Sequence, residues 1–292
     1  MGFVANYVRN LAPLALGRQP QRPLLFSYYI THRCGLDCRY CCDGFGTRFH
    51  DMPVPELSTA EARRLLSVLR RSTDCLDITG GEPLLRPDLE DVLAHAREIG
   101  FRTVLNTKGL GLSGRPDVLR LADVLVFGVD SLDAGRLAGM IGRPRAVAEQ
   151  ILAALDFALQ NRTGRTKVVL SVVATPVNLG DIRELLRFAL DRGLGFQISP
   201  EILGTEPNPE LKSNPLYEEA IDEVLRAKRR HRGVFGVPTL VLRDELFWGL
   251  DATQMAADYA AAGCRWTDPE YARAATLPVG ASRDAAKVRK RS

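Results

Sequence analysis

Three cysteines lie close together near the start of the chain. Cys34, Cys38 and Cys41 form a C-x3-C-x2-C run directly after an apolar segment that we predict to be a strand. A strand points neighbouring side chains to opposite faces, so a loop containing Gly35 is the better support for three thiolates that face one centre. Thiolates favour zinc or iron–sulfur clusters. The run therefore predicts a metal centre on the loop after the first strand.

Two non-catalytic interpretations of this run have less support. A structural zinc site usually has four protein ligands in paired C-x2-C or Cys/His spacing, and the sequence has no second pair. A ferredoxin-like electron carrier needs four cysteines for each cluster, and only three are grouped here. Three ligands leave one metal position open, as catalysis at a cluster requires. An enzyme is therefore favoured, with a zinc protein and an electron carrier as alternatives.

The elements that must position this loop alternate as strand and helix. Apolar residues recur at i, i+3, i+4 and i+7 in the helix candidates, the first of which begins with a capping box formed by Ser58 and Glu61. This alternation predicts right-handed crossovers and a parallel sheet, either flat and doubly wound or curved into a barrel. Several strand candidates are apolar nearly throughout, which predicts strands covered on both faces. The strand candidates are Leu25–Ile30, Leu76–Thr79, Arg102–Leu105, Val124–Val129, Val168–Ala174 and Phe196–Ile198.

The cysteine run resembles the signature of the radical S-adenosylmethionine (SAM) superfamily, in which the residue before the third cysteine is usually aromatic, as Tyr40 is here. Three further motifs follow successive strand candidates. Their order makes the resemblance specific, because α/β barrels build their active sites at the carboxyl ends of strands. The resemblance covers roughly Leu24 to Pro200. The motifs are Thr79-Gly80-Gly81-Glu82-Pro83, which looks like the family's GGE motif, Leu105-Asn106-Thr107-Lys108-Gly109 and Val129-Asp130-Ser131-Leu132-Asp133.

The resemblance implies an α/β fold, a partial (β/α)6 TIM-like barrel with the metal centre at its carboxyl mouth. We expect residues 1–22 to form an N-terminal helical lead-in, residues 23–231 the radical SAM core barrel, and residues 232–292 a C-terminal extension. A lone helix is expected over Asp251–Ala262, before a basic and disordered tail.

In this family, three cysteines hold a [4Fe–4S] cluster, and SAM binds the fourth iron through its amino and carboxylate groups. The resemblance implies that Cys34, Cys38 and Cys41 are those ligands. A reduced cluster then passes one electron to SAM, which breaks into methionine and a 5′-deoxyadenosyl radical that takes a hydrogen atom from the substrate. We expect an external one-electron reductant, flavodoxin- or ferredoxin-like, and a single cluster, because an auxiliary cluster of the SPASM or twitch type would need more cysteines than Cys264 in the C-terminal part.

The same resemblance assigns contacts with SAM. Gly80 and Gly81, followed by Glu82 and Pro83, are expected to let the backbone approach the methionine end of SAM, because a Cβ atom would obstruct it. Glu82 is expected to accept a hydrogen bond from the SAM amino group, and Tyr40 to lie near the adenine.

Other residues at strand ends are candidates for contacts with SAM or the substrate, and each could instead have a purely structural role. Asn106 and Asp130 are expected to contact the ribose or carboxylate of SAM, although both could be turn formers. Gly128 stands where the family often has a serine, and Ser171 on the next strand is a candidate replacement. Cys264 is a candidate hydrogen donor, as in peptide epimerases, although an isolated cysteine is usually structural.

Composition limits the partners. The chain has 292 residues, 46% of them hydrophobic, enough for one large core, and a net charge of only +4, so that no nucleic-acid partner is expected. No segment is apolar enough to span a bilayer. The stretch from Phe3 to Leu16 is expected to pack on the barrel as an amphipathic helix, with contact to a membrane surface as the less favoured alternative. We expect a cytoplasmic protein with reduced thiols.

The sequence does not identify the substrate. The favoured substrate is a peptide or natural product, and the alternative is a lipid or isoprenoid.

Overall fold

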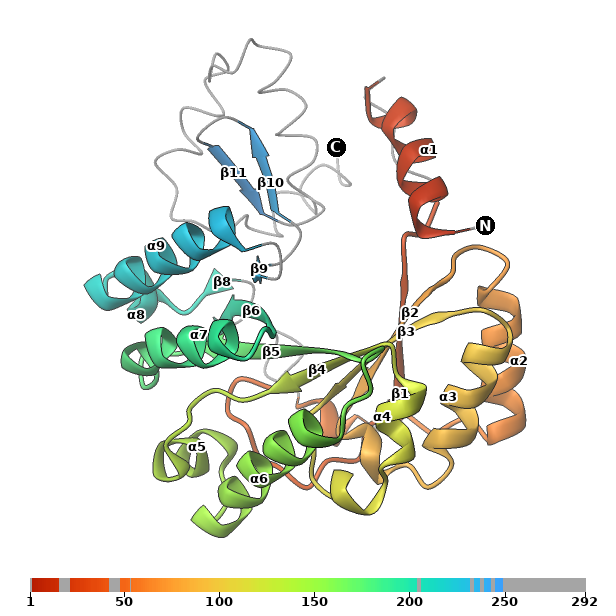
Figure 1. Ribbon diagram of the computed structural model, residues 1–292, viewed down its shortest axis with the longest axis horizontal. Helices are drawn as coiled ribbons and strands as arrows, with labels where there is room; N and C mark the ends of the chain where they lie inside the picture. The colour runs from red at the N-terminus through yellow and green to blue at the C-terminus, as the bar shows by residue number, and fades with distance from the viewer. Residues whose placement is uncertain are drawn as a thin grey trace.

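The chain is built around one parallel sheet (Figure 1). A computed structural model describes residues 2–15, 22–41, 48–52, 54–203, 206–231, 234–236, 239–242 and 245–248. In this part of the chain, the sheet order is β1-β2-β3-β4-β5-β6-β9. Its strands are β1 (Phe26–Thr31), β2 (Cys75–Gly80), β3 (Arg102–Thr107), β4 (Val124–Gly128), β5 (Lys167–Ala174), β6 (Gly195–Pro200) and β9 (Val234–Gly236).

Strands that follow one another along the chain are neighbours in the sheet, and all the pairs are parallel. This confirms the α/β class and the partial (β/α)6 barrel, with strand bounds within about two residues of those predicted. β9 pairs with β6 through Phe196 and Val234. The sheet therefore continues beyond residue 231, into the segment predicted as an extension.

Helices connect the strands and lie around the outside of the curved sheet (Figure 1). The predicted capping box is present at the start of α2, where Ser58 and Glu61 exchange side-chain and backbone hydrogen bonds. The helices are α1 (Phe3–Ala15), α2 (Thr59–Leu69), α3 (Leu89–Glu98), α4 (Asp117–Leu121), α5 (Ala134–Ile141), α6 (Arg145–Asn161), α7 (Ile182–Asp191), α8 (Pro209–Lys212) and α9 (Pro215–Arg230). Short 3-10 turns are η1 (Phe49–Asp51), η2 (Pro83–Leu85), η3 (Leu112–Gly114) and η4 (Leu179–Asp181), and two antiparallel pairs are β7 (Ile202–Leu203) with β8 (Glu206–Pro207) and β10 (Thr239–Leu242) with β11 (Glu245–Trp248).

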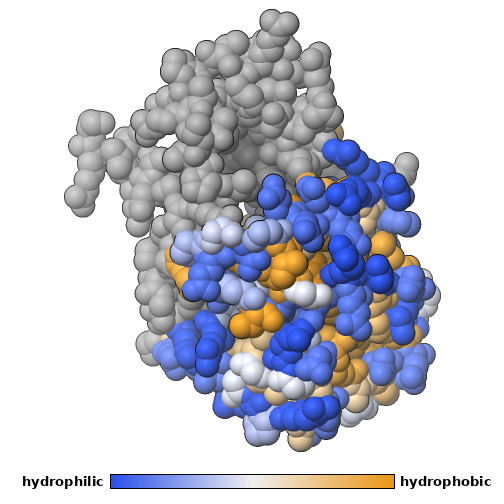
Figure 2. Space-filling model, turned by 90° about the vertical axis from the view of Figure 1, so that its left-hand side faces the viewer, coloured by the Kyte–Doolittle hydropathy of each residue, from blue (hydrophilic) through white to orange (hydrophobic). Residues whose placement is uncertain are grey.

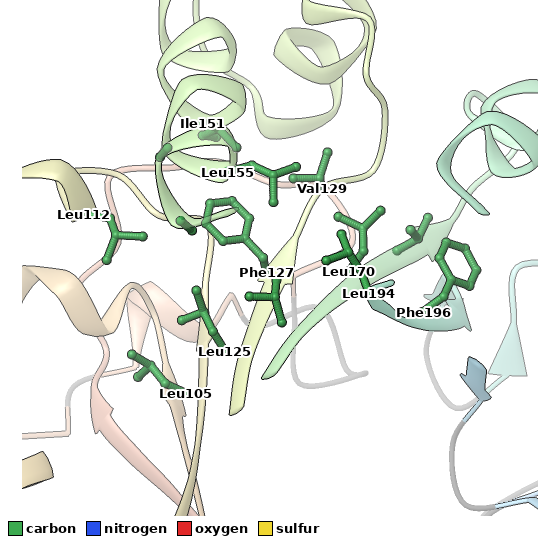
Figure 3. Packing of buried hydrophobic residues seen from close by; sticks show 14 of the residues in the cluster. Leu105, Leu112, Leu125, Phe127, Val129, Ile151, Leu155, Leu170, Leu194 and Phe196 are labelled. Carbon is green, nitrogen blue, oxygen red and sulfur yellow. The ribbon is translucent and has the colours of Figure 1, made fainter. Parts of the chain in front are cut away.

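The outer face of the sheet carries the core. Its apolar side chains are fully or nearly fully buried, and α6 lays Ile151 and Leu155 over Phe127 (Figure 3). Burying one such side chain contributes about 1.5–3 kcal/mol. The outer-face core residues are Ile30, Leu76, Ile78, Leu105, Leu125, Phe127, Val168, Leu170, Val172, Phe196 and Ile198.

The inner face of the sheet is different, because most of its side chains are partly exposed and many are polar. The strand registers place these residues on one face. The expectation of strands covered on both faces was wrong for the described part of the chain, in which helices cover the outer side of a partial barrel and the inner side is partly exposed. The inner face consists of Ser27, Tyr29, Cys75, Asp77, Thr79, Arg102, Val104, Asn106, Val124, Val126, Gly128, Lys167, Val169, Ser171, Val173, Gly195, Gln197 and Ser199.

The N-terminal helix α1 is tied to the amino ends of the first strands. The buried Asn6 amide donates to the carbonyls of Pro23 (2.8 Å) and Ser72 (2.6 Å), and Asn10 donates to Arg22 (2.8 Å). The asparagines that interrupt the apolar pattern of this segment are thus its anchors. No helix of the described residues has the length and hydropathy needed to cross a membrane.

The side of the molecule shown in Figure 2 is mostly hydrophilic over its described part, with hydrophobic residues between the hydrophilic ones. Such scattered apolar residues are normal on protein surfaces. The predicted helix over Asp251–Ala262, the tail and Cys264 lie outside the described residues.

Candidate active site

The cysteine run occupies the loop after β1, as predicted. Cys38 is buried, and Cys34 and Cys41 are half-buried. The loop is held against the end of α5, where the Asp37 amide donates to the carbonyl of Ile141 (2.9 Å). Gly142 has φ of 61°, and a Cβ atom there would lie 2.7 Å from the Asp37 carbonyl oxygen. Close contact with α5 therefore fixes the course of the loop.

The chemistry of the three thiols suits an iron–sulfur cluster. The Leu36 amide donates to Cys34 Sγ (3.5 Å), a contact that favours a thiolate. Burial raises the pKa of Cys34 and Cys38, and the Lys108 cation works in the opposite direction at both. Within the described part of the chain, no three His, Cys, Asp or Glu side chains converge on a single ion. The loop supplies thiolate ligands, which iron–sulfur clusters favour, so the residues present fit such a cluster.

The two glycines of the GGE motif bring the end of β2 against the start of the cysteine loop. The Gly81 amide donates to the Thr31 carbonyl and the Glu82 amide to the Arg33 carbonyl, both at 2.8 Å. Gly80 has φ of 138°, and Cβ atoms at Gly80 and Gly81 would lie 2.2 Å from the Thr31 and Arg33 carbonyl oxygens. Glycine is required here by this backbone packing, and the approach of SAM to the same glycines stays a prediction.

Glu82 joins the end of β2 to the end of β3. Its carboxylate is 2% exposed and accepts hydrogen bonds from Thr107 Oγ1 (2.5 Å), the Lys108 amide (2.9 Å) and the Leu84 amide (3.1 Å). Burial raises the pKa of Glu82, and these hydrogen bonds oppose the rise. A carboxylate has about four acceptor positions, and these donors occupy three of them. Pro83 is buried and begins η2.

Asp130 is the second buried carboxylate of the site and is 1% exposed. Its Oδ2 accepts hydrogen bonds from Tyr40 and from Lys108 Nζ (2.8 Å), and its Oδ1 accepts one from the Val173 amide (2.8 Å). Burial, together with the Asp130 charge, raises the pKa of Tyr40 well above its usual range. The structure thus brings Tyr40 and Asp130 together, and joins them to the cysteine loop through residue 40.

Asn106 belongs to a separate network. Its amide donates to Asp77 Oδ1 (2.5 Å), and Ser27 donates to Asp77 Oδ2 (3.0 Å). This network crosses β1, β2 and β3 on the inner face and is separate from the hydrogen bond between Tyr40 and Asp130. Ser171 lies beside Gly128, because the two residues are partners in the β4–β5 register.

Three residues of the site had no role in the sequence-based predictions. Lys108 stood inside a quoted motif, and Arg86 follows the GGE motif closely. Arg86 is 2% exposed and donates to the carbonyls of Ile30 (3.0 Å) and Leu57 (2.8 Å), besides its ion pair with Asp88 (2.7 Å). Asn178 is buried and donates to the Asp130 carbonyl (2.8 Å). The available signals were a charged residue in an otherwise apolar run for Arg86 and a place in the motif after the third strand for Lys108, and nothing in the sequence marked Asn178.

Comparison with known proteins decides the family. Residues 28–189 match the model of the radical SAM superfamily. The chain belongs to this superfamily. Radical SAM enzymes use a [4Fe–4S] cluster and SAM and depend on an external reductant, and the chain is an enzyme of this class rather than a zinc protein or an electron carrier.

Relatives of known activity cover part of the chain. The GTP 3′,8-cyclase of Mycolicibacterium smegmatis is 36% identical over 177 residues, which are 58% of this chain and 47% of the relative. The GTP 3′,8-cyclase 2 of Mycobacterium tuberculosis is 32% identical over 210 residues, 69% of this chain and 56% of the relative. The chain therefore spans about half the length of these relatives.

Solved structures show the same fold. Streptococcus suis SuiB bound to its precursor peptide SuiA has a TM-score of 0.60 at 16% identity, covering 80% of this chain and 53% of SuiB. The protein anSMEcpe with bound AdoMet has a TM-score of 0.51 at 10% identity, covering 73% of this chain and 62% of that protein. At these identities the likeness concerns the radical SAM fold alone.

Proposed function

We propose that this radical SAM enzyme cleaves SAM reductively and abstracts a hydrogen atom from a substrate that lies against the inner face. The observation that carries the proposal is the meeting of the cysteine loop, Glu82 and the Tyr40–Asp130 pair at the carboxyl ends of β1 to β4. When bound, the cluster and SAM supply a 5′-deoxyadenosyl radical, which is the hydrogen-abstracting species.

The chain's own residues would bind and orient these groups. Cys34, Cys38 and Cys41 would hold three irons, and the remaining acceptor position of Glu82 would meet the SAM amino group. Tyr40, fixed by its hydrogen bond to Asp130, would form the wall beside the adenine. The half-buried Cys34 and Cys41 bring the loop near the surface, where a flavodoxin- or ferredoxin-like protein would deliver one electron.

The charges of the inner face favour a substrate that carries little or no negative charge. Its cations in the described strands β1 to β6 are Arg102 and Lys167, which begin β3 and β5 and thus lie at the end of the sheet away from the cysteine loop. Nearer the loop, the face offers Asp77, Ser171 and Gln197. We therefore propose a peptide or natural product as the substrate, and the polar side chains count against a lipid or isoprenoid.

GTP is the second candidate substrate, because the relatives at 36% and 32% identity are GTP 3′,8-cyclases. It would need cations for its triphosphate, and the inner-face cations Arg102 and Lys167 lie at the end of the sheet away from the cysteine loop. A direct comparison of GTP with peptide substrates separates the two candidates.

The test is anaerobic reconstitution with iron and sulfide, reduction with dithionite, and measurement of 5′-deoxyadenosine formed from SAM. We expect turnover by the wild type, loss of it in Cys34→Ala, Cys38→Ala and Cys41→Ala, and retention in Cys75→Ala, which removes a half-buried thiol outside the loop. Deuterium transfer from GTP, or from a peptide fraction of a cell extract, into 5′-deoxyadenosine would identify the substrate class. Turnover that survives any of the three loop substitutions would disprove the assignment.

A further inference from the structure

Lys108 lies at the centre of the site although no role follows for it from the family motifs. It comes directly after β3, and its side chain crosses to the end of β4. There its ammonium group donates to Asp130 Oδ2 (2.8 Å) and to the Gly128 carbonyl (3.1 Å). The ammonium also lies 5.8 Å from the centre of the Tyr40 ring, a distance typical of a cation–π contact.

The side chain of Lys108 lies against Gly128. A Cβ atom at position 128 would lie 3.4 Å from Lys108 Nζ and 3.5 Å from its Cγ. The family often carries a serine at this position, and its Cβ atom would lie here in ordinary van der Waals contact with the lysine side chain. The lysine side chain therefore lies directly against the position at which the family often carries that serine.

The ammonium group stays charged in this place. Burial alone lowers the pKa of a lysine, but the charges of Asp130 and Cys38 outweigh that effect and raise the pKa of Lys108. An ammonium group has three N–H donors, and Asp130 and Gly128 take two of them. The side chain is 15% exposed, and one N–H donor is left over from the bonds to Asp130 and Gly128.

We propose that Lys108 is a SAM-binding residue of this enzyme, whose ammonium group takes the place of the serine hydroxyl at position 128 and donates its third hydrogen bond to SAM. This inference rests on the proposed function. Asp130 balances the charge of the lysine, so that the pair holds a donor in place without adding net charge beside the sulfonium of SAM. Ser171, the partner of Gly128 in the register, is the competing candidate for the same contact.

The test measures the SAM dissociation constant of the reconstituted holoenzyme by equilibrium dialysis, together with iron per chain and the unfolding temperature. Lys108→Met keeps the length of the side chain over Gly128 but removes the donors. We expect it to retain its iron and to bind SAM at least tenfold more weakly, and we expect Ser171→Ala to bind SAM within about twofold of the wild type. Equal SAM affinity in Lys108→Met and wild type, or a larger loss in Ser171→Ala, would overturn the proposal.

A rescue experiment distinguishes binding from mere support. In the background of Lys108→Ala there is room for the serine, so Lys108→Ala/Gly128→Ser should bind SAM more tightly than Lys108→Ala. If Lys108→Ala/Asp130→Asn recovers the SAM affinity and the serine does not, Lys108 only neutralises Asp130 and the proposal is wrong.

The stability and iron measurements give a further outcome against the proposal. If Lys108→Met loses its iron or its folded structure as well as its SAM affinity, the role of Lys108 is structural. A wild type that binds SAM but does not cleave it would contradict the proposed function and leave this binding test intact.

Discussion

The buried charges of the site are individually paired or hydrogen-bonded. Lys108 faces Asp130, Arg86 faces Asp88, and Glu82 accepts three hydrogen bonds. Breaking a buried pair by removing one partner is costly, because the remaining charge stays in a medium of low dielectric constant. The residues that hold the site are therefore also residues on which the stability of the chain depends.

The contribution of the Arg86–Asp88 pair to stability can be measured by changing the pH. Hydrogen bonds from Arg86 and Thr59 outweigh partial burial and lower the pKa of Asp88 to about 2. Because the folded chain protonates Asp88 less readily than the unfolded chain does, the pair stabilises the fold above about pH 4 and its contribution disappears as the pH falls toward 2. We expect a loss of about 1–2 kcal/mol over this range, allowing for screening by water. Urea unfolding of the cluster-free chain should show this slope reduced in Asp88→Asn and unchanged in Asp156→Asn, an exposed carboxylate of α6. An unchanged slope in Asp88→Asn would refute the assignment.

The hydrogen bonds of Glu82 lead to a second prediction, for the stability and iron content of Glu82→Gln. In Glu82→Gln one carboxylate oxygen becomes an NH2 group, so either the Lys108 amide or the Thr107 and Leu84 donors lose an acceptor. An unsatisfied buried donor costs about 1–3 kcal/mol. We expect the free energy of unfolding to fall by about that amount and the iron content to fall with it. Glu149→Gln, which breaks an exposed pair within α6, is the control and should change neither.

At the scale of elements, the end of β2 and the start of the cysteine loop are in backbone contact. Their spacing depends on Gly80 and Gly81, which leave no room for a Cβ atom. The GGE motif is thus a packing requirement of two neighbouring strand ends, whatever further contacts it makes with SAM.

Gly81→Ala tests this contact. The new Cβ would meet the Arg33 carbonyl oxygen at 2.2 Å, so the loop must shift away from β2. We expect a clear loss of iron per chain after reconstitution. The control, Gly139→Ala, lies in α5 with open space around it and should stabilise the helix by up to about 1 kcal/mol. Normal iron binding in Gly81→Ala would show that the contact is dispensable.

The elements were largely predictable from the sequence, and the reasons lie in particular residues. Runs such as Val168–Ala174 are apolar and β-branched, and the cap Ser58–Glu61 is a local signal, so that both were found without tertiary information. The role of Asn178 depends on a contact with Asp130, 48 residues away, and no local pattern encodes it. The openness of the inner face was missed because valines on the inner face of β4 and β5, such as Val126 and Val169, hide the alternation of polar and apolar sides.

At the scale of the whole molecule, α1 is attached at the amino ends of the strands, away from the cysteine loop. Asn6 is the main attachment, fully buried and bonded to the Pro23 and Ser72 carbonyls. This places the lead-in helix among the parts that hold the barrel together.

Asn6→Ala tests this attachment. Both carbonyls would lose a donor, and we expect the free energy of unfolding to fall by about 1–3 kcal/mol while SAM cleavage per iron stays unchanged. Asn161→Ala, on the exposed end of α6, is the matched control. Thermal unfolding and turnover of the same samples give both quantities. A loss of turnover without a loss of stability would contradict a purely structural role for α1.

The division of each strand into a packed outer side and an open inner side has a consequence for evolution. Substitutions on the outer side disturb the core and cost several kcal/mol, whereas those at partly exposed inner positions such as Ser27 or Gln197 disturb little. Descendants of this chain are therefore free to exchange the groups that meet a substrate while keeping the scaffold that holds the cysteines, so new specificities can arise without new folds.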